Sequence, residues 1–69
     1  MPSTSIRRFE YDPGTKVLSV WFLTSGKRYD YEAVPAETFT AFRGAFSKGR
    51  FFNEHIRDRF RYRLVAEAS

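Results

Sequence analysis

The chain has 69 residues and a formal net charge of +4, which is enough length for one small domain. It contains no cysteine and one histidine, which excludes a disulfide framework, a cysteine-ligated zinc site and a histidine-rich metal site. Thirteen aromatic side chains supply the apolar area that so small a domain needs to fold without such supports. We therefore expect a single domain over residues 1–69, with no metal and no cofactor.

The first half of the chain has the pattern of β-strands. Its first connection contains Pro13 and Gly14 and its second contains Gly26, which are residues that favour tight turns. Apolar and polar side chains alternate between these turns. This pattern predicts a three-stranded antiparallel meander, with strands at about residues 5–11, 16–23 and 27–34.

The second half has the pattern of two short helices. Pro35 suits a first helical position, and Phe39, Phe42 and Phe46 recur at the spacing of one helix face. Ser47 is a candidate N-cap for a second helix. The predicted class is α+β, with both helices packed on one face of the sheet, at about residues 35–46 and 48–57.

The tail, at about residues 58–69, is expected to be extended, as a fourth strand or as a strap along the domain. Arg57, Arg59, Arg61 and Arg63 occupy alternate positions, with apolar residues between the last three. In an extended chain they share a face at a spacing of about 6.6 Å, close to the phosphate repeat of an extended nucleic acid. One arginine guanidinium can donate hydrogen bonds to two phosphate oxygens at once. A solvated tail, or ion pairs with the sheet, is an equally weighted alternative.

The charge is concentrated in the same part of the chain. Residues 1–42 contain five basic and five acidic side chains, whereas residues 43–63 contain seven basic and two acidic ones. Arg50 adds a further candidate for phosphate contacts. If the protein binds RNA or another polyanion, we expect it to do so at this basic end.

Three aromatic residues are candidates for stacking on bases. Tyr29 and Tyr31 share one face of the third predicted strand, and paired rings on a strand can stack bases. The preferred interpretation is that they face the helices, because Arg28 and Asp30 alternate with them. Trp21 is expected on the open face of the sheet, either as a contact for a partner or covered by the tail.

Catalytic signals are weak. His55 lies beside Glu54 and three residues before Asp58, but a packed histidine at a helix edge is the favoured interpretation. Asp30 and Glu32 are interpreted as part of a solvated charged face. The sequence contains no phosphate-binding glycine loop and no nucleophile elbow, so we do not expect an enzyme.

The leading hypothesis is therefore a small RNA-binding module, and the alternative is a protein–protein module whose partner presents an acidic or apolar surface. The longest apolar run has four residues, far short of the roughly 20 that span a bilayer. The first residues lack the apolar centre of a signal peptide. We expect a cytoplasmic monomer with no membrane attachment.

Short elements over nearly the whole chain occur in an order that matches a known family. They are Ser5-Ile6, Tyr11-Asp12, Leu18-x-Val20-x-Phe22, Gly26-x-x-Tyr29-x-Tyr31, Val34-Pro35 and Ala45-x-Ser47-x-Gly49-x-Phe51-Phe52-Asn53-x-x-Ile56. From about residue 5 to 63 the chain resembles the KTSC domain, whose hallmark is the central pair of tyrosines. That family is named for a segment at the C-terminus of some lysyl-tRNA synthetases and also forms small stand-alone proteins.

The resemblance implies RNA binding as the suggested role, and no established activity. This chain departs from the common pattern in having Phe46 between Ala45 and Ser47, and in its density of arginine after residue 56. The second departure favours an electrostatic partner more strongly here than in the family at large.

Overall fold

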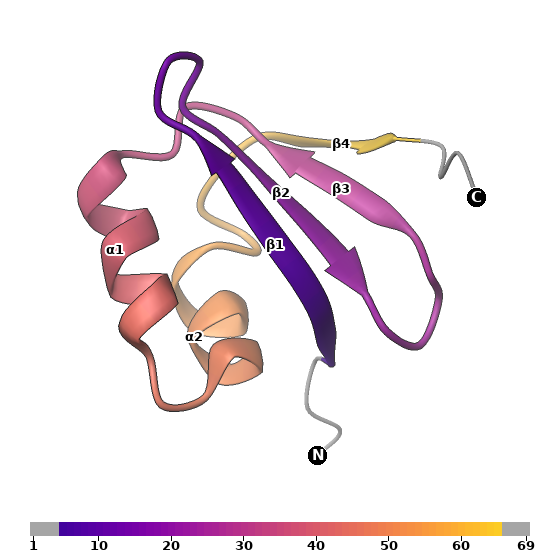
Figure 1. Ribbon diagram of the computed structural model, residues 1–69. Coiled ribbons are helices and arrows are strands. Elements are labelled where there is room, and N and C mark those ends of the chain that lie inside the picture. The colour runs from indigo at the N-terminus through magenta and orange to yellow at the C-terminus, as the bar shows by residue number, and fades with distance from the viewer. Residues whose placement is uncertain (1–4, 66–69) are drawn as a thin grey trace.

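The structure, a computed structural model, describes residues 5–65. It has two layers, an antiparallel four-stranded sheet and two helices that cover one face of it (Figure 1). The strands are ordered β1-β2-β3-β4 in the sheet, and both helices lie between β3 and β4 in the chain. The elements are β1 (Ile6–Asp12), β2 (Val17–Phe22), β3 (Arg28–Tyr31), α1 (Ala36–Gly44), α2 (Lys48–His55) and β4 (Tyr62–Val65). The predicted α+β class is confirmed.

The connections between the first three strands are tight turns, as the glycine positions predict. In the first turn, the backbone N–H of Gly14 donates to the carboxylate of Asp12 at 2.9 Å. In the second turn, Gly26 has a φ of +70°, a left-handed conformation that is cheap only for glycine. The three strands therefore follow one another as the predicted meander.

The hydrophobic core lies between the sheet and the helices. Leu18 and Val20 of β2 are fully buried, and the helices contribute Phe42 and Phe52 to the same cluster. Full burial of a side chain of this size stabilises the fold by roughly 1.5–3 kcal/mol. The core therefore holds the two layers together, as the alternation in β2 and the helical spacing of phenylalanine predict.

The sheet has four strands, whereas three were predicted. Residues Tyr62–Val65 pair antiparallel with β3, with Tyr62 opposite Tyr31 and Arg63 opposite Asp30. The period-two pattern of the tail indicated this strand correctly. The prediction of an extended chain from residue 58 was wrong for its first part, because residues 56–59 form a turn after α2. Residues 66–69 of the predicted tail lie outside the described part of the chain.

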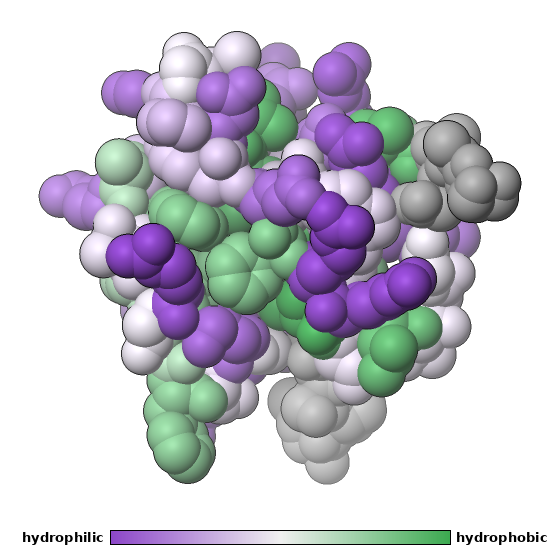
Figure 2. All heavy atoms as spheres, in the orientation of Figure 1, coloured by the Kyte–Doolittle hydropathy of each residue, from purple (hydrophilic) through white to green (hydrophobic). Residues whose placement is uncertain are grey.

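Both helices are shorter than predicted. α1 ends at Gly44 because Ala45 is extended, so Phe46 is fully exposed and does not extend the apolar stripe over the sheet. Figure 2 shows a hydrophobic side chain that projects from the surface in the region of the connection between α1 and α2. The hydroxyl of Ser47 accepts a hydrogen bond from the backbone N–H of Arg50 at 3.3 Å, which confirms the N-cap of α2.

Candidate nucleic-acid interface

A pocket of about 450 Å³ opens between the sheet and the turn that follows α2. Its aromatic lining comes from β2, β3, α2 and β4, and consists of Phe22, Tyr29, Tyr31, Phe52 and Tyr62. Its polar lining consists of Arg57, Asp58, Ser5, Thr24 and Ser25. The volume lies within the roughly 300–1,000 Å³ of small-molecule sites. We call this site the aromatic pocket.

Tyr29 and Tyr31 face the helices, as the preferred interpretation of the sequence predicts. Tyr31 is only 3% exposed, and its ring meets that of Phe52 edge to face at 5.2 Å. Tyr29 is half-buried, with its ring 5.6 Å from that of Phe22. The two tyrosines therefore form no platform on the open face of the sheet, but both line the aromatic pocket.

Tyr62 completes this group from the edge strand. Its ring centroid lies 5.3 Å from that of Tyr31 and 5.6 Å from that of Tyr29, and its side chain is about half exposed. Sequence reasoning did not single out Tyr62 as a site residue, because the tail was considered for its arginines. Its position in the period-two pattern was the available signal, and the pairing of β4 with β3 brings it to the pocket.

Burial raises the pKa of the Tyr31 phenol to about 12. Desolvation is the main cause, the neighbouring Tyr62 adds to it, and the nearby Arg57 guanidinium opposes it. The phenol is therefore neutral at physiological pH. A neutral phenol can donate a hydrogen bond as well as accept one.

The arginine series does not lie on one extended strand. The backbone N–H groups of Ile56 and Arg57 both donate to the carbonyl of Phe52, at 3.0 and 2.8 Å, which closes α2 in a turn. Arg57 and Arg59 lie in this turn, so the spacing predicted for the four side chains is wrong for these two. Arg61 immediately precedes β4 and Arg63 lies in it, where alternate residues share a face.

All four of these arginines are exposed, and within residues 5–65 none of them has a carboxylate within ion-pairing distance. Arg57 lines the aromatic pocket, and the other three follow it along the chain. We call Arg57, Arg59, Arg61 and Arg63 the basic segment. It begins at the pocket with Arg57, continues with Arg59, which lines a second cavity with Phe51 and Phe60, and ends on β4 at the edge of the sheet.

Arg50 is separate from this group. It lies on α2 and forms an exposed ion pair with Glu54 at 3.2 Å, one helical turn away. It does not line the aromatic pocket. Of the predicted phosphate contacts, Arg50 is therefore the one already neutralised by a partner on its own helix.

Trp21 lies on the open face of the sheet, as predicted. It is opposite Arg8 on β1 and Arg28 on β3, whose guanidinium carbons lie 4.4 and 5.1 Å from the ring centroid. Tyr62 and Leu64 alternate onto the other side of the sheet, so β4 does not cover Trp21 through them. The ring is half-buried and engaged with two cations, so it is separate from the aromatic pocket.

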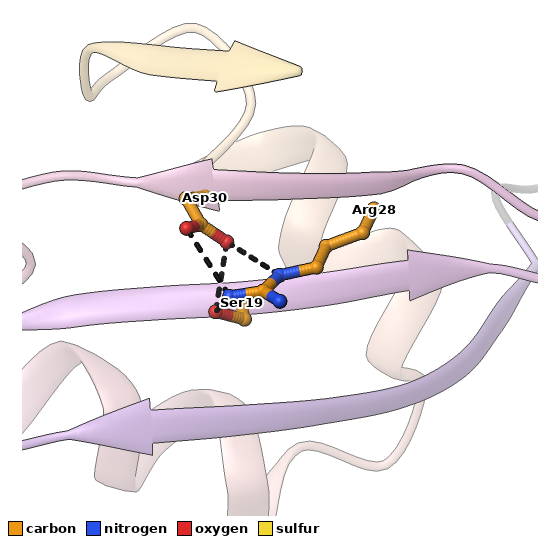
Figure 3. Close-up of polar contacts among 3 residues, drawn as sticks. All are labelled: Ser19, Arg28 and Asp30. Carbon is orange, nitrogen blue, oxygen red and sulfur yellow. Dashed lines mark hydrogen bonds and ion pairs between the residues drawn. The ribbon is translucent and has the colours of Figure 1, made fainter. Parts of the chain in front are cut away.

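The same open face carries a buried polar cluster (Figure 3). Asp30 is 6% exposed and accepts hydrogen bonds from the hydroxyl of Ser19 at 2.8 Å and from Nε of Arg28 at 3.0 Å. The prediction that Asp30 belongs to a solvated face is therefore wrong. Cross-strand pairing causes the difference, because it sets Ser19 directly opposite Asp30.

His55 lies at the exposed end of α2. Its ring packs on that of Phe51 at 4.6 Å, and its Nε2 lies 3.9 Å from the carboxylate of Glu54. Among the described residues, no group of three or more histidine, aspartate or glutamate side chains could hold a metal ion. No helix in residues 5–65 is long and apolar enough to cross a membrane.

The fold and the pocket define a small α+β domain with one aromatic site between its sheet and its second helix. A family model described as the KTSC domain matches residues 2–60, and the chain belongs to this family. A crystal structure of a KTSC domain protein from Yersinia pestis is similar, with a TM-score of 0.86 and 35% identity, over 96% of this chain and 92% of that one. The resemblance inferred from the sequence is confirmed.

Three proteins of known sequence are similar to this chain. An uncharacterized protein of Stutzerimonas stutzeri is 46% identical over 54 residues, which cover 78% of this chain and 75% of that protein. A protein of Tsukamurella paurometabola is 41% identical over 59 residues, covering 86% and 87%. A lysine–tRNA ligase of Nostoc is 35% identical over 61 residues, which cover 88% of this chain but only 11% of the ligase.

Proposed function

We propose that this protein is a small, non-catalytic binding module for single-stranded RNA, which it contacts through the basic segment. The observation that carries the proposal is the arginine series that begins at the aromatic pocket and has no carboxylate partner within residues 5–65. Arginine forks bind phosphate oxygens strongly, and aromatic rings bind unstacked bases. Arg57 lies at the rings of the pocket, whereas Arg63 lies on the other side of the edge strand β4, opposite Asp30, so a bound RNA strand passes around this edge of the sheet.

The distribution of ion pairs supports this location. Of the five other arginines in residues 5–65, three are paired with carboxylates, Arg8 with Glu10, Arg28 with Asp30 and Arg50 with Glu54, and Arg7 and Arg43 are not. The basic segment has no such partners within residues 5–65, so its charge is available to a polyanion. An unpaired cation contributes more to phosphate binding, because no existing ion pair has to be broken.

The similarity to part of a lysine–tRNA ligase supports RNA over other polyanions, since an enzyme of that name acts on tRNA. The similar segment forms only 11% of that ligase, so the aminoacylation activity itself is not transferred to this chain. An RNA-binding role fits a cytoplasmic monomer, which we propose as its state and location.

The test is the salt dependence of binding to a random pool of single-stranded RNA, measured by fluorescence anisotropy. Four phosphate contacts predict a slope of about −3 in a plot of log affinity against log salt, at about 0.7 per phosphate. Replacing Arg61 or Arg63 with Gln should reduce the slope by about 0.7 each. Arg50→Gln is the matched control and should leave the slope unchanged. Absence of binding at about 50 mM salt, where electrostatic contacts are strong, would overturn the proposal.

A protein–protein module is the second candidate, favoured by one specific observation. Phe46 is fully exposed at the connection between α1 and α2, and Leu23 and Leu64 are more than half exposed. Exposed aromatic side chains are common anchors of protein interfaces. Under this alternative, Phe46→Ser abolishes binding to a protein partner, and RNA affinity does not respond to the basic segment.

A further inference from the structure

The aromatic pocket has a lining that suits a flat ligand. Its walls are rings: Tyr31 meets Phe52 edge to face at 5.2 Å and lies beside Tyr62 at 5.3 Å, with 32° between the two ring planes. Tyr62 is half exposed, so its ring can take part in stacking on a ligand. Open space of about 450 Å³ bounded by rings favours a planar partner.

Arg57 and Asp58 supply the polar side of the pocket. An ionised carboxylate only accepts hydrogen bonds, through two oxygens, and a guanidinium only donates them, through a planar fork. Both side chains line the pocket together with Tyr31. Within residues 5–65 neither side chain has an ion-pair partner. The pocket therefore offers a pair of acceptors beside a pair of donors.

Guanine is the nucleobase that matches this arrangement. Its N1–H and N2 amino groups are adjacent donors, which a carboxylate can accept together, and its O6 and N7 are adjacent acceptors that suit an arginine fork. Adenine, cytosine and uracil lack the two adjacent donors. We propose that the aromatic pocket binds one unstacked guanine base of an RNA strand, with Asp58 on its N1–H and N2 amino groups and Arg57 on O6 and N7.

This inference rests on the proposed function, because the strand on either side of the guanine is held outside the pocket. Arg57 contacts the base in this arrangement, so Arg59, Arg61 and Arg63 remain for phosphates, and the salt slope expected for a strand with guanosine is about −2. Arg63 lies on the face of β4 away from the pocket, so the strand passes around this edge of the sheet to reach it. The basic segment then sets the affinity for any strand. The pocket sets the preference for one base within it.

The test compares two labelled RNA oligonucleotides, an oligouridine and the same strand with one central guanosine, at about 50 mM salt. We expect the strand with guanosine to bind about tenfold more tightly, as for one well-read base. Inosine lacks the N2 amino group, so a strand with inosine at that position should lose most of the preference. Asp58→Asn should remove the preference and leave affinity for oligouridine equal or higher, because a negative charge is lost.

A second variant guards against an effect of Asp58→Asn on the fold. Tyr62→Ala should also remove the preference for guanosine, and circular dichroism would verify that each variant is folded. Equal binding of both strands by the wild-type protein, with the salt dependence intact, would overturn the guanine site and leave RNA binding standing. No binding of either strand would overturn both proposals. Guanosine monophosphate that bound as tightly as the strand would show that the ligand is a free nucleotide.

Discussion

Tyr62 of β4 lies directly opposite Tyr31 of β3, and their ring centroids are 5.3 Å apart. This pairing connects the C-terminal strand to the core, because Tyr31 in turn packs against Phe52 of α2. It also brings Tyr62 into the lining of the aromatic pocket, while Arg63, next to it in the strand, lies on the opposite face of the sheet. A single cross-strand contact thus links the stability of the domain to the geometry of its candidate site.

Replacing Tyr62 with Ala is expected to lower the free energy of unfolding by about 1 kcal/mol, the usual worth of aromatic contacts in proteins. The side chain is half exposed, so the loss of buried area is moderate. Tyr62→Phe keeps the ring and should be close to wild type. Urea denaturation followed by circular dichroism measures both, and equal stability of the two variants would contradict the role given to the ring.

The raised pKa of Tyr31 predicts a change of stability at high pH. Its pKa is about 12 in the folded protein against an ordinary value of 10.0, so folding favours the protonated phenol. This contribution is fully present below about pH 10 and is lost as pH rises from there through about 12. Unfolding free energies measured over this range should therefore fall with pH.

The Tyr31→Phe variant is the control for this prediction. It has no phenol to ionise at this position, so the fall should be smaller than in the wild-type protein. Ultraviolet absorbance of tyrosinate should also lose the titration step near pH 12. Identical pH profiles of the two proteins would contradict the assignment to Tyr31.

Asp30→Ala is expected to destabilise the protein by about 2–3 kcal/mol, because the Ser19 hydroxyl and the Arg28 guanidinium lose their shared acceptor in a buried site. Removing one exposed ion-pair partner, as in Glu10→Ala, should cost only about 0–1 kcal/mol. Thermal or chemical unfolding gives the difference. A loss for Asp30→Ala as small as that for Glu10→Ala would mean that the polar cluster is not stabilising.

Phe42 and Phe46 provide a matched pair that tests the end of α1. Phe42 is fully buried, and Phe42→Ala should lower stability by about 3–5 kcal/mol. Phe46 is fully exposed, and Phe46→Ala should change stability by less than about 0.5 kcal/mol. A large loss in the second variant would show that Phe46 covers the sheet after all, as the helical spacing alone predicts.

The amino-acid sequence by itself predicted the meander, the two helices and the burial of Tyr31. It did so because alternation, helical spacing, capping and turn residues are local properties of neighbouring positions. It also predicted the N-cap at Ser47 and the family. The end of α1 before Phe46 was missed, because spacing of apolar residues does not reveal where the backbone leaves the helix.

Only the tertiary structure decided which residues from distant parts of the chain come into contact. The fourth strand pairs with β3, which places Tyr62 against Tyr31, and the turn after α2 brings Arg57 to the aromatic pocket. Cross-strand register likewise buries Asp30 against Ser19. Strand pairing depends on contacts between residues that are far apart in the chain. The packing free energy of these contacts has to exceed the entropy lost on ordering the chain, and no local sequence pattern reveals that difference. The sequence therefore determined the elements and the charge of this protein, and the packing of the chain decided its candidate site.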